Sequence, residues 1–138
     1  MTDFETYQSP FTWRYGSPEM RVIWSEAGKR RLWRKLWVAM AEAQIPFGLV
    51  TREQADELAA HSEDIDVSRT LEIEKEIHHD LMAEIRVFAA QCPAGGPILH
   101  LGATSMDIKD NAEALQTRQS LDLVLIKLSR LLRAFQDK

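Results

Sequence analysis

Two adjacent histidines followed by an aspartate, His78-His79-Asp80, are the residues of this chain best suited to acid/base chemistry. A carboxylate beside an imidazole can fix its tautomer and raise its basicity, which would make His79 an oriented acid or base. Metal binding is disfavoured, because adjacent residues on a helix point about 100° apart and no cysteine lies nearby. The alternative, favoured by the local sequence alone, is that Asp80 only caps a helix and both histidines are surface residues on an acidic helix.

A second candidate site lies where a glycine-containing loop meets a helix, at Gly102-Ala103-Thr104-Ser105. The free backbone N–H groups of a helix N-terminus, its dipole and two hydroxyls would suit a carboxylate or a phosphate. An ordinary Thr or Ser cap is the alternative, and this loop alone does not decide between them.

A third candidate is the pair Arg14-Tyr15, which precedes a predicted helix. An arginine fork beside a phenol could hold an anionic group. Such a pair more often anchors an arm on the protein surface.

A basic cluster from Lys29 to Lys35 suggests nucleic-acid binding, with Trp33 and Trp37 as stacking platforms. The two tryptophans share one helical stripe with Met40 and Ala41, so we expect them in the core. The basic residues then form the solvated opposite face, with their aliphatic stems over the ring edges.

Helix signals surround these candidates. One helix is predicted to start at Ser17-Pro18, to restart or continue at Ser25, and to end at Pro46. Further helices are predicted over 51–61, opened by a capping box, over about 68–76, from an Asp80 cap to Pro93, and from Thr104 onward. No segment alternates with period two, and the predicted fold class is all-α.

Composition limits the function classes. The chain has 138 residues, 45% hydrophobic and 28% charged, with a net charge of -4, which is typical of one ordered globular domain without a general nucleic-acid footprint. Its only cysteine, Cys92, excludes an internal disulfide. With neither a signal peptide nor an apolar run long enough for a membrane span, we expect a soluble, cytoplasmic protein.

The last helix carries an apolar seam with the spacing of a helical bundle. Its residues are Leu121, Val124, Leu128, Leu131 and Phe135, widened by Leu125 and Leu132. No Gly, Asn or Pro stops the helix before Lys138, so it looks cut rather than finished. We therefore expect its apolar face to be buried by another chain or by missing sequence.

In combination, five stretches resemble the N-terminal part of the adenylosuccinate lyase family, in the fumarase/aspartase superfamily. They occur in the family's order and are Tyr7-Gln-Ser-Pro10, Arg14-Tyr15-Gly-Ser-Pro-Glu-Met20, Trp33-Arg-Lys-Leu-Trp37 with Ala41-Glu-Ala, His79-Asp80-Leu-Met-Ala83, and His100-Leu-Gly-Ala-Thr-Ser105 with Asp110-Asn111. The resemblance implies an N-terminal helical domain over 1–110 and the truncated start of a central helical-bundle domain over 111–138.

The resemblance also implies an activity. A homotetramer would eliminate fumarate from adenylosuccinate to give AMP, and would act on the succinylated imidazole carboxamide ribotide of purine synthesis. The reaction is a β-elimination that needs no metal or organic cofactor, and no nucleic-acid or membrane partner is expected.

Site residues follow from the resemblance position by position. His79 matches a histidine that assists the acid side of catalysis or binds substrate, and Asp80 would orient it. Thr104 and Ser105 match residues that hold the succinyl group. Arg14 and Tyr15 match positions that contact the nucleotide, at its phosphate. His78 is a further substrate-binding candidate and stands where an arginine is expected.

The family's main acid/base histidine and its catalytic serine loop do not occur in the chain, so we expect an inactive fragment. Two other interpretations stay open. One is another superfamily member, such as argininosuccinate lyase or a carboxymuconate cycloisomerase. The other is a non-enzymatic helical module that oligomerises through its last helix.

Overall fold

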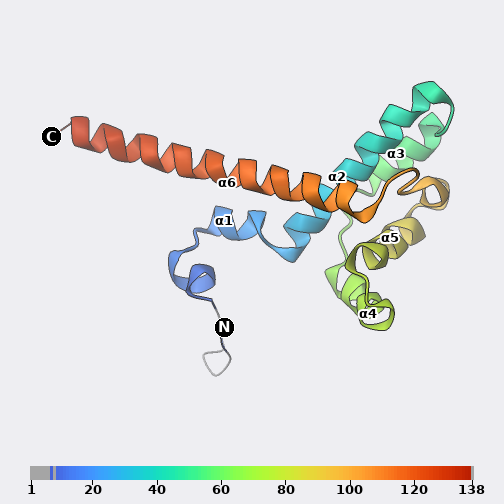
Figure 1. The fold of residues 1–138 in the computed structure, drawn as a ribbon, viewed down its shortest axis with the longest axis horizontal. Helices are drawn as coiled ribbons and strands as arrows, with labels where there is room; N and C mark the ends of the chain where they lie inside the picture. Colours follow the sequence, from blue (N-terminus) through green and yellow to red (C-terminus); the bar gives the residue numbers. More distant parts are fainter. Residues whose placement is uncertain (1–6, 8, 138) are drawn as a thin grey trace.

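The computed structural model describes Tyr7 and residues 9–137, and every regular element in that part of the chain is a helix (Figure 1). The all-α prediction is confirmed. Gln8 of the Tyr7–Pro10 stretch, residues 1–6 and Lys138 lie outside the described residues. The elements are η1 (Phe11–Tyr15), α1 (Pro18–Ile23), α2 (Glu26–Gln44), η2 (Ile45–Phe47), α3 (Arg52–Ala60), α4 (Val67–Ile77), α5 (Asp80–Gln91), η3 (Gly96–Ile98) and α6 (Ser105–Gln136). None of the described helices combines the length and apolar character that a membrane crossing requires.

Serine caps set the starts of α1 and α2. The Ser17 hydroxyl accepts a hydrogen bond from the backbone N–H of Met20, and the Ser25 hydroxyl accepts one from Gly28. The helix therefore restarts at Ser25 and does not continue through it. Gly28 allows a close approach at this corner, because a Cβ there would lie only 2.4 Å from the carbonyl oxygen of Val22.

The predicted capping box opens α3. Thr51 donates its backbone N–H to the Gln54 side chain, and the Thr51 hydroxyl accepts from the Gln54 backbone. Before it, α2 ends at Gln44 and passes into the short helix η2, which contains Pro46. The predicted end at this proline is confirmed to within two residues.

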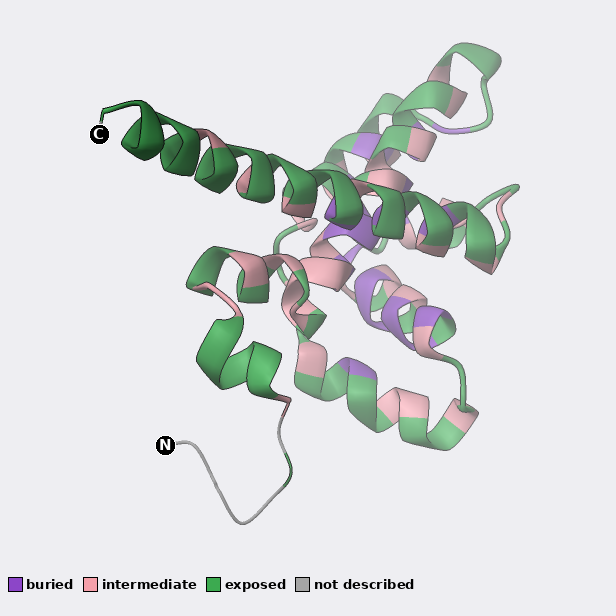
Figure 2. Cartoon of the chain, turned by 60° about the vertical axis from the view of Figure 1, so that its left-hand side comes forward, coloured by how far each residue is buried: buried purple, intermediate pink, exposed green. Residues whose placement is uncertain are grey.

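The core lies where α2, α3, α5 and the first half of α6 meet (Figure 2). Trp33 and Trp37 of α2 are each 1% exposed, which confirms them as core residues. Trp37 packs against Phe88 of α5, with ring centroids 6.2 Å apart. Leu58 of α3 and Ile108 of α6 are fully buried in the same cluster.

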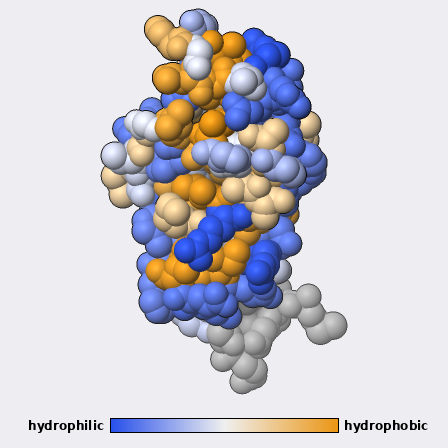
Figure 3. Space-filling view, turned by 90° about the vertical axis from the view of Figure 1, so that its right-hand side faces the viewer, coloured by the Kyte–Doolittle hydropathy of each residue, from blue (hydrophilic) through white to orange (hydrophobic). Residues whose placement is uncertain are grey.

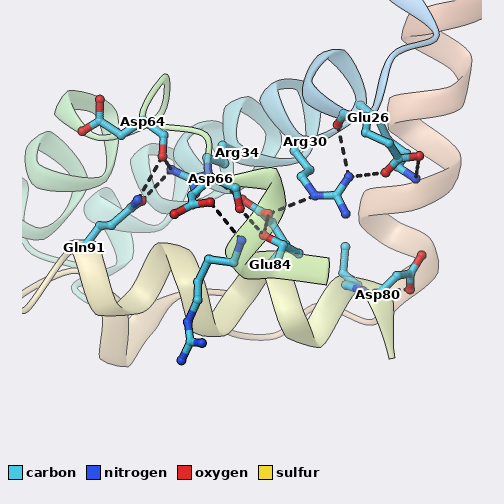
Figure 4. A network of polar contacts seen from close by, with 12 residues as sticks. Glu26, Arg30, Arg34, Asp64, Asp66, Asp80, Glu84 and Gln91 are labelled. Carbon is cyan, nitrogen blue, oxygen red and sulfur yellow. Dashed lines mark hydrogen bonds and ion pairs between the residues drawn. The ribbon is translucent and has the colours of Figure 1, made fainter. Parts of the chain in front are cut away.

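Two of the basic residues on α2 are buried, contrary to the predicted solvated face. Arg30 and Arg34 both contact Glu84 of α5, which is itself 0% exposed (Figure 4). The Arg34 Nε lies 2.7 Å from one carboxylate oxygen, and the Arg30 Nε lies 3.3 Å from the other. The prediction is wrong for these two side chains because a buried carboxylate from a distant segment compensates their charges.

The same carboxylate also holds α4. The hydroxyl of Thr70, which is buried, donates to Glu84 at 2.7 Å. Arg34 extends the network through its Nη1, which donates to the carbonyl oxygens of His61 and Asp64 and to the Gln91 side chain. Glu84 and Arg34 together thus join α2, α4, α5 and the loop between α3 and α4.

The long helix α6 packs only along its first half. Ile108, Ala112 and Gln116 are buried, and Gln116 donates to the carbonyl oxygen of Ile23 at 2.7 Å. The second half extends away from the other helices (Figure 1). Its apolar seam is uncovered as expected, with exposed fractions from 48% to 68% for Leu121, Val124, Leu125, Leu128, Leu131, Leu132 and Phe135. The predicted boundary between residues 110 and 111 falls inside this continuous helix and stays a prediction.

Exposed apolar side chains are not confined to the seam. The end of the molecule opposite the free end of α6 also presents apolar surface between polar side chains (Figure 3). Phe47 and Leu49, after α2, are exposed as well.

Glu84→Gln should lower the free energy of unfolding by about 3–5 kcal/mol, because it leaves the buried guanidinium of Arg34 without a counter-charge and that of Arg30 with only the exposed carboxylate of Glu26. Urea unfolding followed by circular dichroism measures the loss. The matched control is Glu63→Gln, which removes an exposed carboxylate paired with Arg31 and Lys35 and should cost less than about 1 kcal/mol. Equal losses in the two variants would contradict a structural role for the buried cluster.

Candidate functional site

The His78-His79-Asp80 motif and Ser105 line the same cleft, which has a volume of about 480 Å³. The cleft lies where α4 ends and where α5 and α6 begin, and Glu74, Met106 and Lys109 complete its lining. Two helix N-termini therefore face one opening, which favours an anionic ligand. Within the described residues, no His, Cys, Asp and Glu side chains form a group of three or more that could hold a metal ion.

His79 is the N-cap of α5. Its backbone is extended, and its Nδ1 accepts a hydrogen bond from the backbone N–H of Met82 at 3.2 Å. The predicted Asp80 cap is wrong, because Asp80 is already the first helical residue. An Nδ1 that accepts a hydrogen bond carries no proton, so a neutral His79 ring has its proton on Nε2. His79, which is exposed, is therefore arranged to donate from Nε2.

His78 ends α4 in a left-handed conformation, with φ at 53°. Its backbone N–H donates to the carbonyl oxygen of Glu74 at 2.8 Å, which closes the helix. The side chain is exposed and lines the cleft. An imidazole binds an anion less strongly than a guanidinium does, so His78 would hold an anion less strongly than the arginine expected at this position.

Asp80 pairs with Lys109 rather than with His79. The Lys109 Nζ lies 2.8 Å from Oδ2 and 3.1 Å from Oδ1 of Asp80, whereas the His79 Nδ1 is 3.9 Å from Oδ1. Burial alone would raise the pKa of Asp80, but hydrogen bonds from Lys109 and from the Leu81 backbone outweigh it and the pKa is lowered. The expected orientation of His79 by Asp80 is not what this geometry provides, since the Met82 backbone holds the ring.

Thr104 and Ser105 begin α6 and differ in their surroundings. The Thr104 backbone N–H and hydroxyl both donate to Asp107, at 2.7 Å and 3.1 Å, which confirms the predicted cap with an acidic residue three positions on. The same backbone hydrogen bond, helped by the hydroxyl, lowers the pKa of Asp107. The Ser105 hydroxyl forms no hydrogen bond within residues 9–137, and it is the one free to meet a ligand in the cleft.

Arg14 and Tyr15 lie away from the His79 cleft, on η1. The Arg14 guanidinium stacks 4.3 Å from the Trp13 ring centroid, and Tyr15 is exposed. Tyr15 lines a separate, mostly apolar cavity of about 650 Å³ between η1, α1 and the middle of α6, together with Trp24 and Val124. The structure thus places the five other predicted site residues in one region and these two in another.

Two residues near the cleft were missed by sequence reasoning, Lys109 and His100. His100 precedes α6 with φ at 68°, and its Nδ1 accepts from the indole N–H of Trp37 at 3.1 Å. Burial lowers the pKa of His100, and the charge of nearby His79 acts in the same direction against that of Asp107. Neither residue had a local signal, because each has its partner on a distant part of the chain.

The lowered pKa of His100 predicts a loss of stability at mildly acidic pH. Its contribution is complete above its ordinary pKa of 6.5 and declines as the pH falls from 6.5 toward the lower value in the fold, because the unfolded chain binds the proton first. The urea concentration at the unfolding midpoint should therefore decrease when the pH is lowered from 7.5 to 5.5. Both pH values lie above the range in which Asp80 and Asp107 titrate.

His100→Asn is the matched variant for this test. Asparagine tolerates positive φ and offers an acceptor to Trp37, but it does not titrate. The fall in the urea midpoint between the two pH values should be smaller in His100→Asn than in the unchanged chain. The same fall in both proteins would rule out His100 as its source.

Comparison with known proteins gives a consistent set of relatives. The chain is 40% identical over 131 residues to the adenylosuccinate lyase of Schistosoma mansoni, 39% over 132 residues to that of Methanocaldococcus jannaschii, and 36% over 132 residues to that of Saccharomyces cerevisiae. These matches cover 94%, 94% and 93% of this chain, but only 27%, 29% and 27% of the relatives. No family model matches the chain.

The similarity thus extends along nearly the whole chain, while the chain spans less than a third of the length of the curated relatives it matches. It includes the His79-Asp80 motif and the start of α6 at Ser105, which the fold brings to one cleft. By sequence, this chain is thus similar to adenylosuccinate lyases along nearly all of its own length and a little over a quarter of theirs.

Proposed function

We propose that the chain forms one wall of the active site of an adenylosuccinate lyase. The observation that carries the proposal is the convergence of His79 and Ser105 on one cleft between two helix N-termini. The similarity to adenylosuccinate lyases along nearly the whole chain supports the same activity. Its substrates would be adenylosuccinate and the succinylated imidazole carboxamide ribotide, in the cytoplasm.

The reaction would be a β-elimination on the succinyl group. A base removes a proton beside a carboxylate, the carbon–nitrogen bond breaks, and an acid protonates the departing nitrogen, which gives fumarate and AMP from adenylosuccinate. Between these events negative charge accumulates on the carboxylate, and fixed donors stabilise it best. The base and the acid for these two transfers would come from parts of the lyase beyond this chain.

The residues of the cleft would supply those donors. The Ser105 hydroxyl and the free backbone N–H groups of α6 would hold one succinyl carboxylate, with Thr104 beside them. His79 would donate from Nε2 to substrate, since Nδ1 is occupied by Met82. Asp80 would act on the architecture of the cleft, because its carboxylate is already held by Lys109.

Arg14 and Tyr15 would contact the nucleotide, at its phosphate. A guanidinium suits phosphate because it forms paired, charge-assisted hydrogen bonds. Tyr15 lines the other cavity and Arg14 precedes it on η1, so this part of the proposal is independent of the His79 cleft.

Self-association is the second part of the proposed function, and the uncovered seam favours it. We propose that the full-length lyase is a homotetramer and that residues 115–137 contribute to its interface. Burial of a large apolar side chain stabilises an interface by roughly 1.5–3 kcal/mol, so a seam of this size provides a strong driving force.

His79→Gln should lower kcat by about 100-fold or more in a lyase that contains this chain, because it removes the positioned Nε2 donor. The readout is steady-state release of fumarate. The 138-residue chain alone should be inactive.

His79→Asn separates chemistry from helix capping. Asparagine is a favoured N-cap and can accept from Met82, so α5 should form normally. Both variants should lose activity to a similar extent. Near-normal turnover in His79→Asn would show that His79 matters only as a cap.

The seam predicts that the 138-residue chain forms dimers or larger species at low micromolar concentration. Light scattering measures the mass directly against the 15.8 kDa monomer. Leu128→Gln combined with Leu131→Gln should shift the population toward monomer. Leu49→Gln, which changes an exposed leucine outside α6, is the matched control and should leave the mass unchanged. A folded monomer in the unchanged chain would disprove association through the seam.

A further inference from the structure

Lys109 occupies a distinctive place in the cleft. It lies on the second turn of α6, and its ammonium contacts both carboxylate oxygens of Asp80, the first residue of α5, at 2.8 Å and 3.1 Å. Both side chains are about 30% exposed, so water screens the pair only in part. The pair is therefore fixed in geometry more firmly than a surface ion pair.

This pair is the polar connection between the two helices. Among the hydrogen bonds and ion pairs of residues 9–137, only the contact of Lys109 with Asp80 joins α5 to α6. The remaining connection is apolar, through buried residues such as Leu81 and Ile108 in the shared core. Apolar contacts are non-directional, so they fix the separation of two helix ends less exactly than a bidentate ion pair does.

Asp80 also supports the turn that carries His79. Its Oδ1 accepts the backbone N–H of Leu81 at 2.7 Å, and His79 accepts the N–H of the next residue, Met82. The carboxylate that Lys109 holds is thus part of the same first turn of α5. A displacement of Asp80 changes that turn and with it the direction of the His79 ring.

We propose that Lys109 is a positioning residue that sets the distance and orientation of His79 relative to Ser105. It acts through Asp80 and does not need to touch substrate. The proposal concerns the donor pair of the cleft and so rests on the proposed function for its catalytic meaning, although the geometry is testable without any activity.

The first experiment uses the 138-residue chain and two probes of the first turn of α5. These are the pKa of Asp80 and the hydrogen-exchange rate of the Met82 amide, both measured by NMR. Lys109→Met should raise the pKa of Asp80 toward its ordinary value and speed the exchange of the Met82 amide about tenfold. Lys109→Arg, which restores the cation, should keep the exchange within about twofold of the unchanged chain.

Lys35→Met is the matched control, since Lys35 is an exposed lysine on α2 that pairs with Glu63 of the loop between α3 and α4. It should move neither probe. Asp80→Asn removes the pair from the other side and should change the exchange of Met82 as Lys109→Met does, with no further change in the double variant. If Lys109→Met unfolds the chain, Asp80→Asn and Lys109→Arg still decide the question. The proposal would be overturned if the Met82 amide exchanged no faster in Lys109→Met or in Asp80→Asn than it does in Lys35→Met.

The second experiment measures kcat and KM for adenylosuccinate in a lyase that contains the chain. Lys109→Met should lower kcat/KM by about tenfold or more, and Lys109→Arg should recover most of it. If Lys109→Met changes the pKa of Asp80 and the exchange rate of the Met82 amide but leaves kcat/KM unchanged, the proposal that Lys109 positions the donors for catalysis is overturned. If the lyase with the unsubstituted chain has no activity on adenylosuccinate, the proposed function is overturned instead. The NMR result on Lys109 would still stand.

Discussion

The buried carboxylate of Glu84 holds together the helices on which the candidate site depends. It meets two guanidinium groups from α2 and a hydroxyl from α4 while sitting on α5. The end of α4 carries His78, and the start of α5 follows His79. Removing charges from water is costly, so this cluster is stable only with its partners in place. The packing of α2, α4 and α5 against one another therefore depends on one buried carboxylate in the core (Figure 4).

Much of this fold could be predicted from local sequence. The serine caps at Ser17 and Ser25, the capping box at Thr51 and the stripe through Trp33 and Trp37 are set by neighbouring residues, and the structure has them all. The burial of Arg30 and Arg34 could not be predicted in the same way. A basic run on a helix has the same pattern whether it faces water or a buried carboxylate, and Glu84 lies 50 residues beyond Arg34.

The candidate site shows the same division between local and distant information. The motifs with His79 and Ser105 were evident from the sequence, and the fold brings both to one cleft. The choice of cap was not evident, because His79 and Asp80 both offer an acceptor and only the backbone conformation decides between them. Lys109 and His100 were missed since a lysine on a predicted helix and a histidine in a loop give no signal of their partners.

The shape of α6 has a mechanical consequence. A helix of 32 residues is about 48 Å long, and this one is held by the core only along its first half. It behaves as a lever whose fulcrum lies near Gln116, with Ser105 on the short arm and the apolar seam on the long arm. A transverse force on the long arm produces a torque at the packed half, so whatever surrounds the seam also restrains the angular motion of the end that carries Ser105. At about 1.5 Å per residue, the seam lies about 24 to 45 Å from Ser105, so contacts made there would bear on the rigidity of the cleft from that distance.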